Sequence, residues 1–186
     1  MRTGLVERAM GGDHDAFTGL VELDGDRCYA IAMGILRDPE LAQDAVQQAF
    51  LLAWRDLRSL RDPERFGPWL HRLLVNACYE ETRRRRRWTS RVRVLPVDGP
   101  DEPAHVDPTI ALADRDALER AFARLTPEHR AVVVLHHQVG LPLAEISEIV
   151  RVPIGTVKSR LHYATRTLRE ALDPGDAVEG PREMLA

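Results

Sequence analysis

The chain has 186 residues, of which 44% are hydrophobic and 30% are charged, and its formal net charge is −3. These values fit a water-soluble protein of one or two small domains. No apolar run in the sequence approaches the ~20 residues needed to cross a bilayer, which excludes a membrane-spanning protein. The N-terminus also lacks the apolar core of a signal peptide. We therefore expect a cytoplasmic protein.

Helix-forming residues dominate the sequence, and aromatic residues make up only 5% of it. This composition predicts an all-α fold. Residues 15–36 carry apolar side chains mostly three and four positions apart, as one helix face requires. Asp38 and Pro39 are then suited to cap and open a second helix with an apolar stripe over residues 41–57. Asp62 and Pro63 start a third helix in the same way, with a buried face between Phe66 and Ala77.

The next segment differs sharply in composition. Residues 91–108 contain four prolines and four acidic residues but few apolar side chains, which is typical of a linker. We therefore predict an N-terminal helical domain over residues 1–90 and a flexible acidic linker over 91–110. A C-terminal helical domain follows over 111–173, with a disordered tail over 174–186.

The C-terminal block contains the most informative pattern. A helix is expected over residues 110–125, Thr126 caps the next helix, and residues 140–142 end it. Residues 143–162 then read as a helix, a three-residue turn at 153–155 and a second helix. The second helix opens with Thr156, Lys158, Ser159 and Arg160. Small polar and cationic side chains at a helix N-terminus are what the DNA major groove admits, so this pattern predicts DNA binding.

The charge distribution qualifies that prediction. Arg83 to Arg87 form an unbroken cationic run, and the segment from Lys158 to Arg169 contains no acidic residue. The chain as a whole is nevertheless acidic, so we expect weak binding to DNA by the protein alone and a partner that holds it there. The two cysteines, Cys28 and Cys78, and the seven histidines show no spacing typical of a metal site. We expect neither a metal nor a cofactor.

The motifs together resemble a known family. Residues 125–130, 143–146 and 155–160 are similar to the fourth conserved region of group 4, or extracytoplasmic-function (ECF), sigma factors of bacterial RNA polymerase. Residues 44–54 and 66–76 are similar to their second conserved region. The resemblance covers residues 13–172, and both regions occur in the family's order.

The resemblance implies three sets of site residues. The second region grips the polymerase core, which implies a contact made by Asp44, Gln47, Gln48 and Leu51. It also opens and reads the promoter −10 element, which implies roles for Ser59, Leu60, Arg61, Trp69, Arg72, Asn76, Arg83 and Arg84. The fourth region reads the −35 element, which implies roles for Arg151, Thr156, Lys158, Ser159, Arg160, His162, Tyr163 and Arg166.

Three of these residues depart from the family pattern. Leu60 stands where an aromatic residue is common, and an aliphatic side chain stacks poorly on a base. Arg151 stands where glycine is frequent, at a cost of roughly 1 kcal/mol if the backbone is left-handed there. Tyr163 stands where arginine commonly reaches a base, and tyrosine cannot make the bidentate contact to guanine. We therefore expect an unusual −35 preference.

The sequence thus predicts a non-enzymatic alternative sigma factor that recruits RNA polymerase, through its β′ and β subunits, to selected promoter DNA. The family often works under an anti-sigma factor, which we expect here too. Two alternatives stay open. A helix-turn-helix regulator acting without polymerase would bind a palindromic duplex tightly by itself. A polymerase-binding inhibitor would compete for the core and start no transcription.

Overall fold

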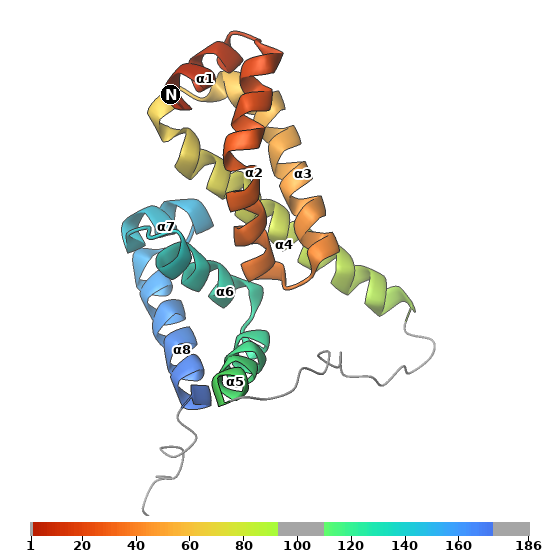
Figure 1. Ribbon diagram of the computed structural model, residues 1–186, viewed down its shortest axis with the longest axis vertical. Coiled ribbons are helices and arrows are strands. Elements are labelled where there is room, and N and C mark those ends of the chain that lie inside the picture. Colours follow the sequence, from red (N-terminus) through yellow and green to blue (C-terminus); the bar gives the residue numbers. More distant parts are fainter. Residues whose placement is uncertain (1, 93–109, 173–186) are drawn as a thin grey trace, which may run out of the picture.

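The computed structural model describes residues 2–92 and 110–172, and every regular element in these two segments is helical, as predicted (Figure 1). The predicted tail lies outside the described residues, as do positions 93–109 of the predicted linker. None of the described helices is long and apolar enough to cross a membrane. The elements are α1 (Arg2–Met10), α2 (His14–Leu36), α3 (Pro39–Asp56), η1 (Leu57–Ser59), η2 (Pro63–Arg65), α4 (Phe66–Val92), α5 (Ile110–Arg124), α6 (Pro127–Val133), η3 (Val134–Gln138), α7 (Leu143–Val150) and α8 (Ile154–Leu172).

Aspartate caps set the starts of the N-terminal helices. The Asp38 carboxylate accepts from the backbone N–H groups of Glu40 and Leu41, both at 3.1 Å, and Pro39 opens α3 as predicted. Asp62 caps in the same way, but it starts only the 3₁₀ turn η2, and α4 begins at Phe66. Pro68 explains the later start, because it has no N–H to donate to the Glu64 carbonyl.

The N-terminal half is built on three helices. Helices α2, α3 and α4 pack against one another through the predicted apolar faces, which include Leu20, Ile31, Phe66 and Leu74. Helix α1 lies across α2 and was not predicted, because its apolar pattern is short and only Val6 and Ala9 are buried.

The C-terminal half contains the predicted helix-turn-helix. Helix α7 ends at Val150, its C-cap residue Arg151 has a left-handed φ of 54°, and α8 begins at Ile154. The predicted turn at 153–155 was therefore placed too late, and residues 151–153 form it instead. The reason is that the Pro153 carbonyl already accepts from the N–H groups of Thr156 and Val157, which brings Ile154 and Gly155 into the first helical turn.

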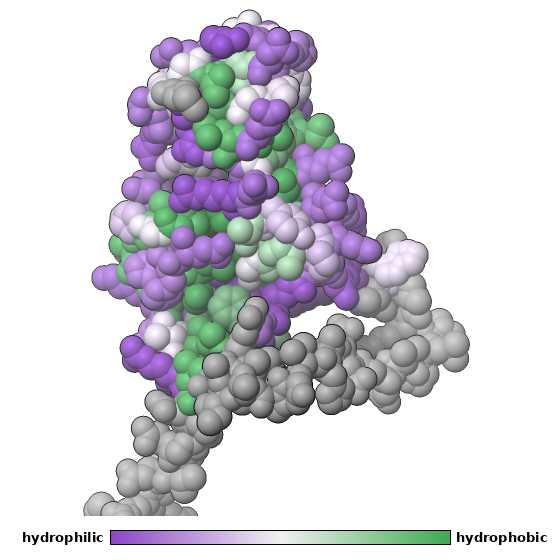
Figure 2. Space-filling view, viewed as in Figure 1, coloured by the Kyte–Doolittle hydropathy of each residue, from purple (hydrophilic) through white to green (hydrophobic). Residues whose placement is uncertain are grey.

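The two halves share one hydrophobic core. Helix α2 packs on α6 and η3, and α4 packs on α7, so buried residues such as Ile35 and Leu74 belong to the same cluster as Leu135 and Ile149. Figure 1 shows the teal α6 and the blue α7 beside the lower part of α2, with α8 extending below them. In the same view, Figure 2 shows hydrophobic residues emerging in patches between hydrophilic ones along this junction.

Candidate DNA and polymerase interfaces

Helix α8 presents the predicted −35 residues on its outer side. Ser159, Tyr163 and Arg166 follow one another at spacings of four and three residues, so they lie on one face. Lys158 and His162 flank that face and are also exposed, whereas Val157 and Ala164 point into the core. The helix therefore exposes a strip of cationic and polar side chains on an apolar support.

Several of these side chains already have intramolecular contacts. The Ser159 hydroxyl donates to the Thr156 carbonyl at 3.0 Å. The Tyr163 ring lies 4.8 Å from the His129 ring, and the Arg166 guanidinium lies 5.8 Å from the Tyr163 ring. Arg166 is therefore held beside Tyr163, and Arg151 projects from the exposed turn at one end of the strip.

Thr156 and Arg160 are only half exposed. Arg160 is a charged neighbour of Tyr79 on α4 and of Glu128 on α6. Burial raises the pKa of Tyr79 and keeps its hydroxyl protonated, with Glu128 reinforcing the shift and Arg160 opposing it. Arg160 thus stands at the edge of the −35 strip that faces the N-terminal half.

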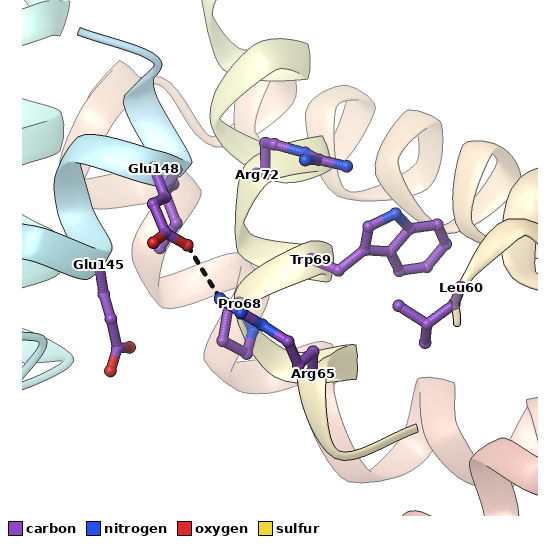
Figure 3. Close-up of a pocket in the computed structure, with 8 residues that line it drawn as sticks. Leu60, Arg65, Pro68, Trp69, Arg72, Glu145 and Glu148 are labelled. Atoms are coloured by element: carbon purple, nitrogen blue, oxygen red, sulfur yellow. Dashed lines mark hydrogen bonds and ion pairs between the residues drawn. The ribbon is translucent and has the colours of Figure 1, made fainter. Parts of the chain in front are cut away.

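The predicted −10 residues divide between a cleft and an open helix face. Leu60, Trp69 and Arg72 line a cleft of about 250 Å³, and Figure 3 shows Leu60 and Trp69 on one side of it. Leu60 is 8% exposed and Trp69 is partly buried, with its ring 5.9 Å from that of Phe66. Ser59 and Arg61 are exposed beside the cleft, and the Ser59 hydroxyl donates to the Asp56 carbonyl at 2.6 Å.

The opposite wall of the cleft comes from the C-terminal half. Glu145, Glu148 and Ile149 of α7 complete the lining, and a guanidinium nitrogen of Arg65 lies 2.9 Å from a Glu148 carboxylate oxygen (Figure 3). No role was predicted for Arg65 or for these two glutamates. No spacing in the sequence could have predicted this contact, because Arg65 and Glu148 come together only through tertiary packing.

Further along α4, Asn76 is exposed, and Arg83 and Arg84 form ion pairs. Arg83 lies 2.5 Å from Glu80, and Arg84 lies 3.0 Å from Glu81 and 3.4 Å from Asp44. The Arg83–Glu80 and Arg84–Asp44 pairs are exposed and contribute little to stability, so these contacts can be exchanged for a phosphate, whereas Arg84 also neutralises the buried Glu81. Trp88 is also exposed, at 67%, directly after the arginine run.

A buried histidine lies beneath this face. His71 of α4 is 8% exposed, and its Nδ1 has no hydrogen-bond partner. Burial lowers the pKa of His71 to about 4, and the nearby Arg27 and Arg2 add to the shift. The imidazole is therefore neutral in the folded protein at neutral pH.

The predicted polymerase-binding residues lie on the outer side of α3. Asp44, Gln47, Gln48 and Leu51 are all exposed, and Leu51 is 58% exposed. Gln47 and Leu51 border an apolar groove of about 520 Å³ between α2 and α3, whose floor includes Phe17, Val21 and Phe50. Phe17 and Val21 were predicted as part of an apolar stripe, but only the packing of α2 on α3 places them in a groove with Leu51.

Comparisons with known proteins agree with this arrangement. The family profile of Sigma-70 region 2 matches residues 20–88, and that of Sigma-70, region 4, matches residues 115–168. ECF RNA polymerase sigma factor SigM of Mycobacterium tuberculosis is 34% identical over 90% of this chain and 83% of that protein. ECF RNA polymerase sigma factor SigW of Bacillus subtilis is 27% identical over 90% of this chain and 94% of that protein.

The chain belongs to the ECF sigma factors of RNA polymerase. Two solved structures have the fold of this sigma factor, each at 24% sequence identity. CnrH in complex with the cytosolic domain of CnrY has a TM-score of 0.64 over 94% of this chain and 98% of that one. RpoE in complex with the anti-sigma factor NepR, from Bartonella quintana, has a TM-score of 0.65 over 84% of this chain and 96% of that one.

The sigma factor thus carries its candidate DNA residues on two separate helices. Lys158, Ser159, His162, Tyr163 and Arg166 are exposed on α8, Thr156 and Arg160 are partly buried beside them, and Arg151 lies in the turn before the helix. The −10 residues are distributed over η1, the loop that follows it and four turns of α4. Individual assignments of these residues to promoter positions remain predictions.

Proposed function

We propose that this sigma factor divides promoter recognition between its two halves. The N-terminal half binds the polymerase core through α3 and the melted −10 strand through α4 and the loop before it. The C-terminal half places α8 in the −35 major groove. The protein acts in the cytoplasm and without catalysis of its own.

The observation that best supports this division is the strip on α8. Its exposed cations follow one helix face, and its apolar side is fixed by Val157 and Ala164, so the helix is presented rigidly to a groove. Arg166 and Lys158 are suited to phosphate contacts, which position the helix. Tyr163 and Thr156 are suited to contacts with base edges or thymine methyl groups.

The −10 assignment rests on chemistry suited to an unpaired strand. Single-strand readers combine apolar surfaces with hydrogen-bonding amides and a cationic track. Trp69 and Leu60 supply the apolar surface, Asn76 the amide, and Arg72, Arg83 and Arg84 the track. Extracting a base from the stack costs a few kcal/mol, which contacts of this kind offset.

The polymerase assignment rests on the groove between α2 and α3. An apolar groove bordered by Gln47 and Leu51 suits a helical partner, whose apolar side chains fill the groove while the amides bond along its edge. The exposed Leu51 would serve as the central apolar contact.

We also propose an anti-sigma factor as a partner. Both solved structures named above contain a protein of this fold bound to a second protein, and in one of them RpoE is named as a sigma factor and NepR as its anti-sigma factor. Purification of this sigma factor from unstressed cells should recover a small protein besides polymerase. Recovery of polymerase alone would contradict the proposal.

Run-off transcription on a genomic-fragment library tests the function itself. Purified core polymerase with this sigma factor should give new discrete start sites that share a −35/−10 pair. The control is core polymerase alone. If the protein binds the core but produces no new start sites, the polymerase-binding inhibitor is favoured. If the free protein binds a palindromic duplex tightly, the helix-turn-helix regulator is favoured.

A further inference from the structure

Helix α6 contributes one aromatic side chain to the edge of the −35 strip. His129, for which no role was predicted, lies in the first turn of α6 and is half-buried. Its ring centroid lies 4.8 Å from that of Tyr163, and the two ring planes are tilted by 44°. This separation is within the range of a direct contact between aromatic rings. A residue outside α8 therefore packs on the middle side chain of the strip.

The backbone at Tyr163 is held by the packing of α8 on α5 and α6. The next residue, Ala164, is fully buried in a small apolar cluster with Leu125 and Val133. Rotation of α8 about its axis would expose Ala164, so the cluster keeps α8 in one orientation. The Cα–Cβ bond of Tyr163 therefore points in one direction relative to α6.

The imidazole of His129 is itself anchored within α6. Its Nδ1 and the Thr126 hydroxyl share a hydrogen bond at 2.8 Å, and the Thr126 hydroxyl oxygen accepts from the His129 backbone N–H at 3.5 Å. Burial lowers the pKa of His129, Arg160 adds to this shift, and Glu128 opposes it. The ring is therefore neutral at neutral pH, and its orientation is restrained in the free protein.

Arg166 restrains the Tyr163 ring from the following turn of α8. Its guanidinium lies 5.8 Å from the ring centroid, which is a cation–π distance. A tyrosine on a helix surface otherwise exchanges between two χ1 rotamers. Because His129 and Arg166 both contact the ring, Tyr163 loses less conformational freedom when it meets DNA.

The exposed part of Tyr163 is suited to one feature of the major groove. The side chain is still 47% exposed and lies on the same helix face as Ser159 and Arg166. Its ring edge is apolar, and the only apolar group that a base pair presents in the major groove is the C5 methyl group of thymine. A fixed ring edge can therefore distinguish thymine from a base that lacks this methyl group.

We propose that His129 is a positioning residue for −35 recognition, which holds the Tyr163 ring edge against the methyl group of one thymine. The proposal rests on the proposed role of α8 in the −35 major groove. His129 acts through Tyr163 and contacts no base itself. Loss of its ring leaves α8 able to enter the groove but less able to select thymine at that position.

Deletion of single methyl groups from the DNA tests the proposal. In a −35 duplex taken from a start site found by run-off transcription, each thymine is replaced in turn by deoxyuridine, which lacks only the methyl group. Binding of the complete chain is measured by fluorescence anisotropy. Replacement of the contacted thymine should weaken binding by about fourfold, the effect of burying one methyl-sized group. Tyr163→Ala should abolish this difference, which identifies the contacted thymine.

Variants of His129 then show whether its ring positions Tyr163. His129→Ala should reduce the difference between thymine and uracil to about twofold or less, because the ring contact is lost. His129→Phe keeps an aromatic ring and should restore most of the difference. The matched control is His137→Ala, the same substitution at an exposed histidine of η3, which should leave the difference unchanged. Both duplexes are compared with the same variant, so any loss of folded protein cancels from the ratio.

The ring contact is also measured without DNA. The chain contains three tyrosines, and in protein labelled with 3-fluorotyrosine the ¹⁹F resonance of Tyr163 is assigned by its loss in Tyr163→Phe. His129→Ala should shift this resonance, whereas His137→Ala should not. An unshifted resonance in His129→Ala would refute the contact on which the proposal depends.

The outcomes separate the proposal from the function on which it rests. If Tyr163→Ala removes a uracil effect that His129→Ala leaves at full size, His129 does not position the ring. If no thymine shows an effect that depends on Tyr163, the ring reads no methyl group and the proposal is wrong. Absence of specific −35 binding by the wild type, alone and with core polymerase, would instead count against the proposed function.

Discussion

The two candidate DNA surfaces of this sigma factor are built in different ways. The −35 strip lies on one helix, is supported by α6 and α7 beneath it, and stays exposed in the folded chain. The −10 surface is assembled from η1, the loop after it and α4, and α7 covers part of it. A surface on one helix is available as soon as its domain folds, whereas a composite surface is open to regulation by whatever packs on it.

The prediction with the largest expected loss of stability tests whether the two halves unfold together as one cooperative unit. Leu135 of the C-terminal half is fully buried, and Leu135→Ala should lower the free energy of unfolding by about 2–5 kcal/mol. All three tryptophans, Trp54, Trp69 and Trp88, lie in the N-terminal half. If the shared core makes unfolding cooperative, urea denaturation followed by tryptophan fluorescence should detect the destabilisation.

Phe66→Ala serves as the reference for that experiment. Phe66 is fully buried beside Trp69, so its truncation should cost about 3–5 kcal/mol and shift the fluorescence transition directly. A fluorescence transition that moves for Phe66→Ala and stays in place for Leu135→Ala would show two independent domains.

His71 predicts an acid sensitivity that belongs to the −10 half. Its folded pKa of about 4 lies below the ordinary 6.5, so the unfolded chain binds a proton first as the pH falls. This part of the stability is complete above about pH 6.5 and is lost as the pH falls towards 4, by about 2 kcal/mol between pH 7.5 and 5. His71→Leu should remove that loss, as measured by urea unfolding at both pH values. An equal pH dependence in variant and wild type would contradict the assignment.

Arg160→Ala should weaken binding to −35 duplex by roughly tenfold, within the 1–3 kcal/mol of a good DNA contact. If α8 neutralises ~4 phosphates, log affinity falls with log salt at a slope near −3.6, and loss of one phosphate contact reduces this by about 0.9. Fluorescence anisotropy at several salt concentrations measures both. Arg169→Ala, at an exposed position near the end of the same helix, is the control. An unchanged affinity and slope would remove Arg160 from the interface.

Asn76→Ala should show the reverse pattern. Its exposed amide lies on α4, far from the −35 strip in the sequence, so −35 duplex binding should be normal. Promoter opening with core polymerase should slow by about fivefold, the effect of one hydrogen bond of roughly 1 kcal/mol. Opening is followed by permanganate reactivity of unpaired thymines. Equal losses in both assays would contradict the division between the two surfaces.

The smallest expected change in stability concerns Arg37 and Arg151, the two helix C-cap residues with a left-handed backbone conformation. Arg151→Gly should raise the stability by about 1 kcal/mol, or a few degrees in Tm, because glycine adopts a φ of 54° without strain. Arg37 has a φ of 59°, but its side chain pairs with Glu119 and lies over the Phe122 ring, so Arg37→Gly should gain less. Differential scanning calorimetry compares them. A larger gain for Arg37→Gly would show that the Glu119 and Phe122 contacts contribute nothing.

The sequence by itself determined the local structure and the residues of the −35 strip. Helix propensity, apolar spacing and aspartate or threonine caps act over a few residues, so they specified α2, α3 and the helix-turn-helix. The short helix α1 escaped detection, because two buried side chains give too little periodicity.

Tertiary structure decided the rest. The start of α4 at Phe66 and the end of the turn at Pro153 depend on which carbonyl groups accept which N–H groups. The groove between α2 and α3, the contact between Gly34 and Val134, and the placement of Glu148 at Arg65 join residues far apart in the chain. No local pattern encodes such contacts, because they arise from the shapes of two helix faces that meet only when the whole chain is folded.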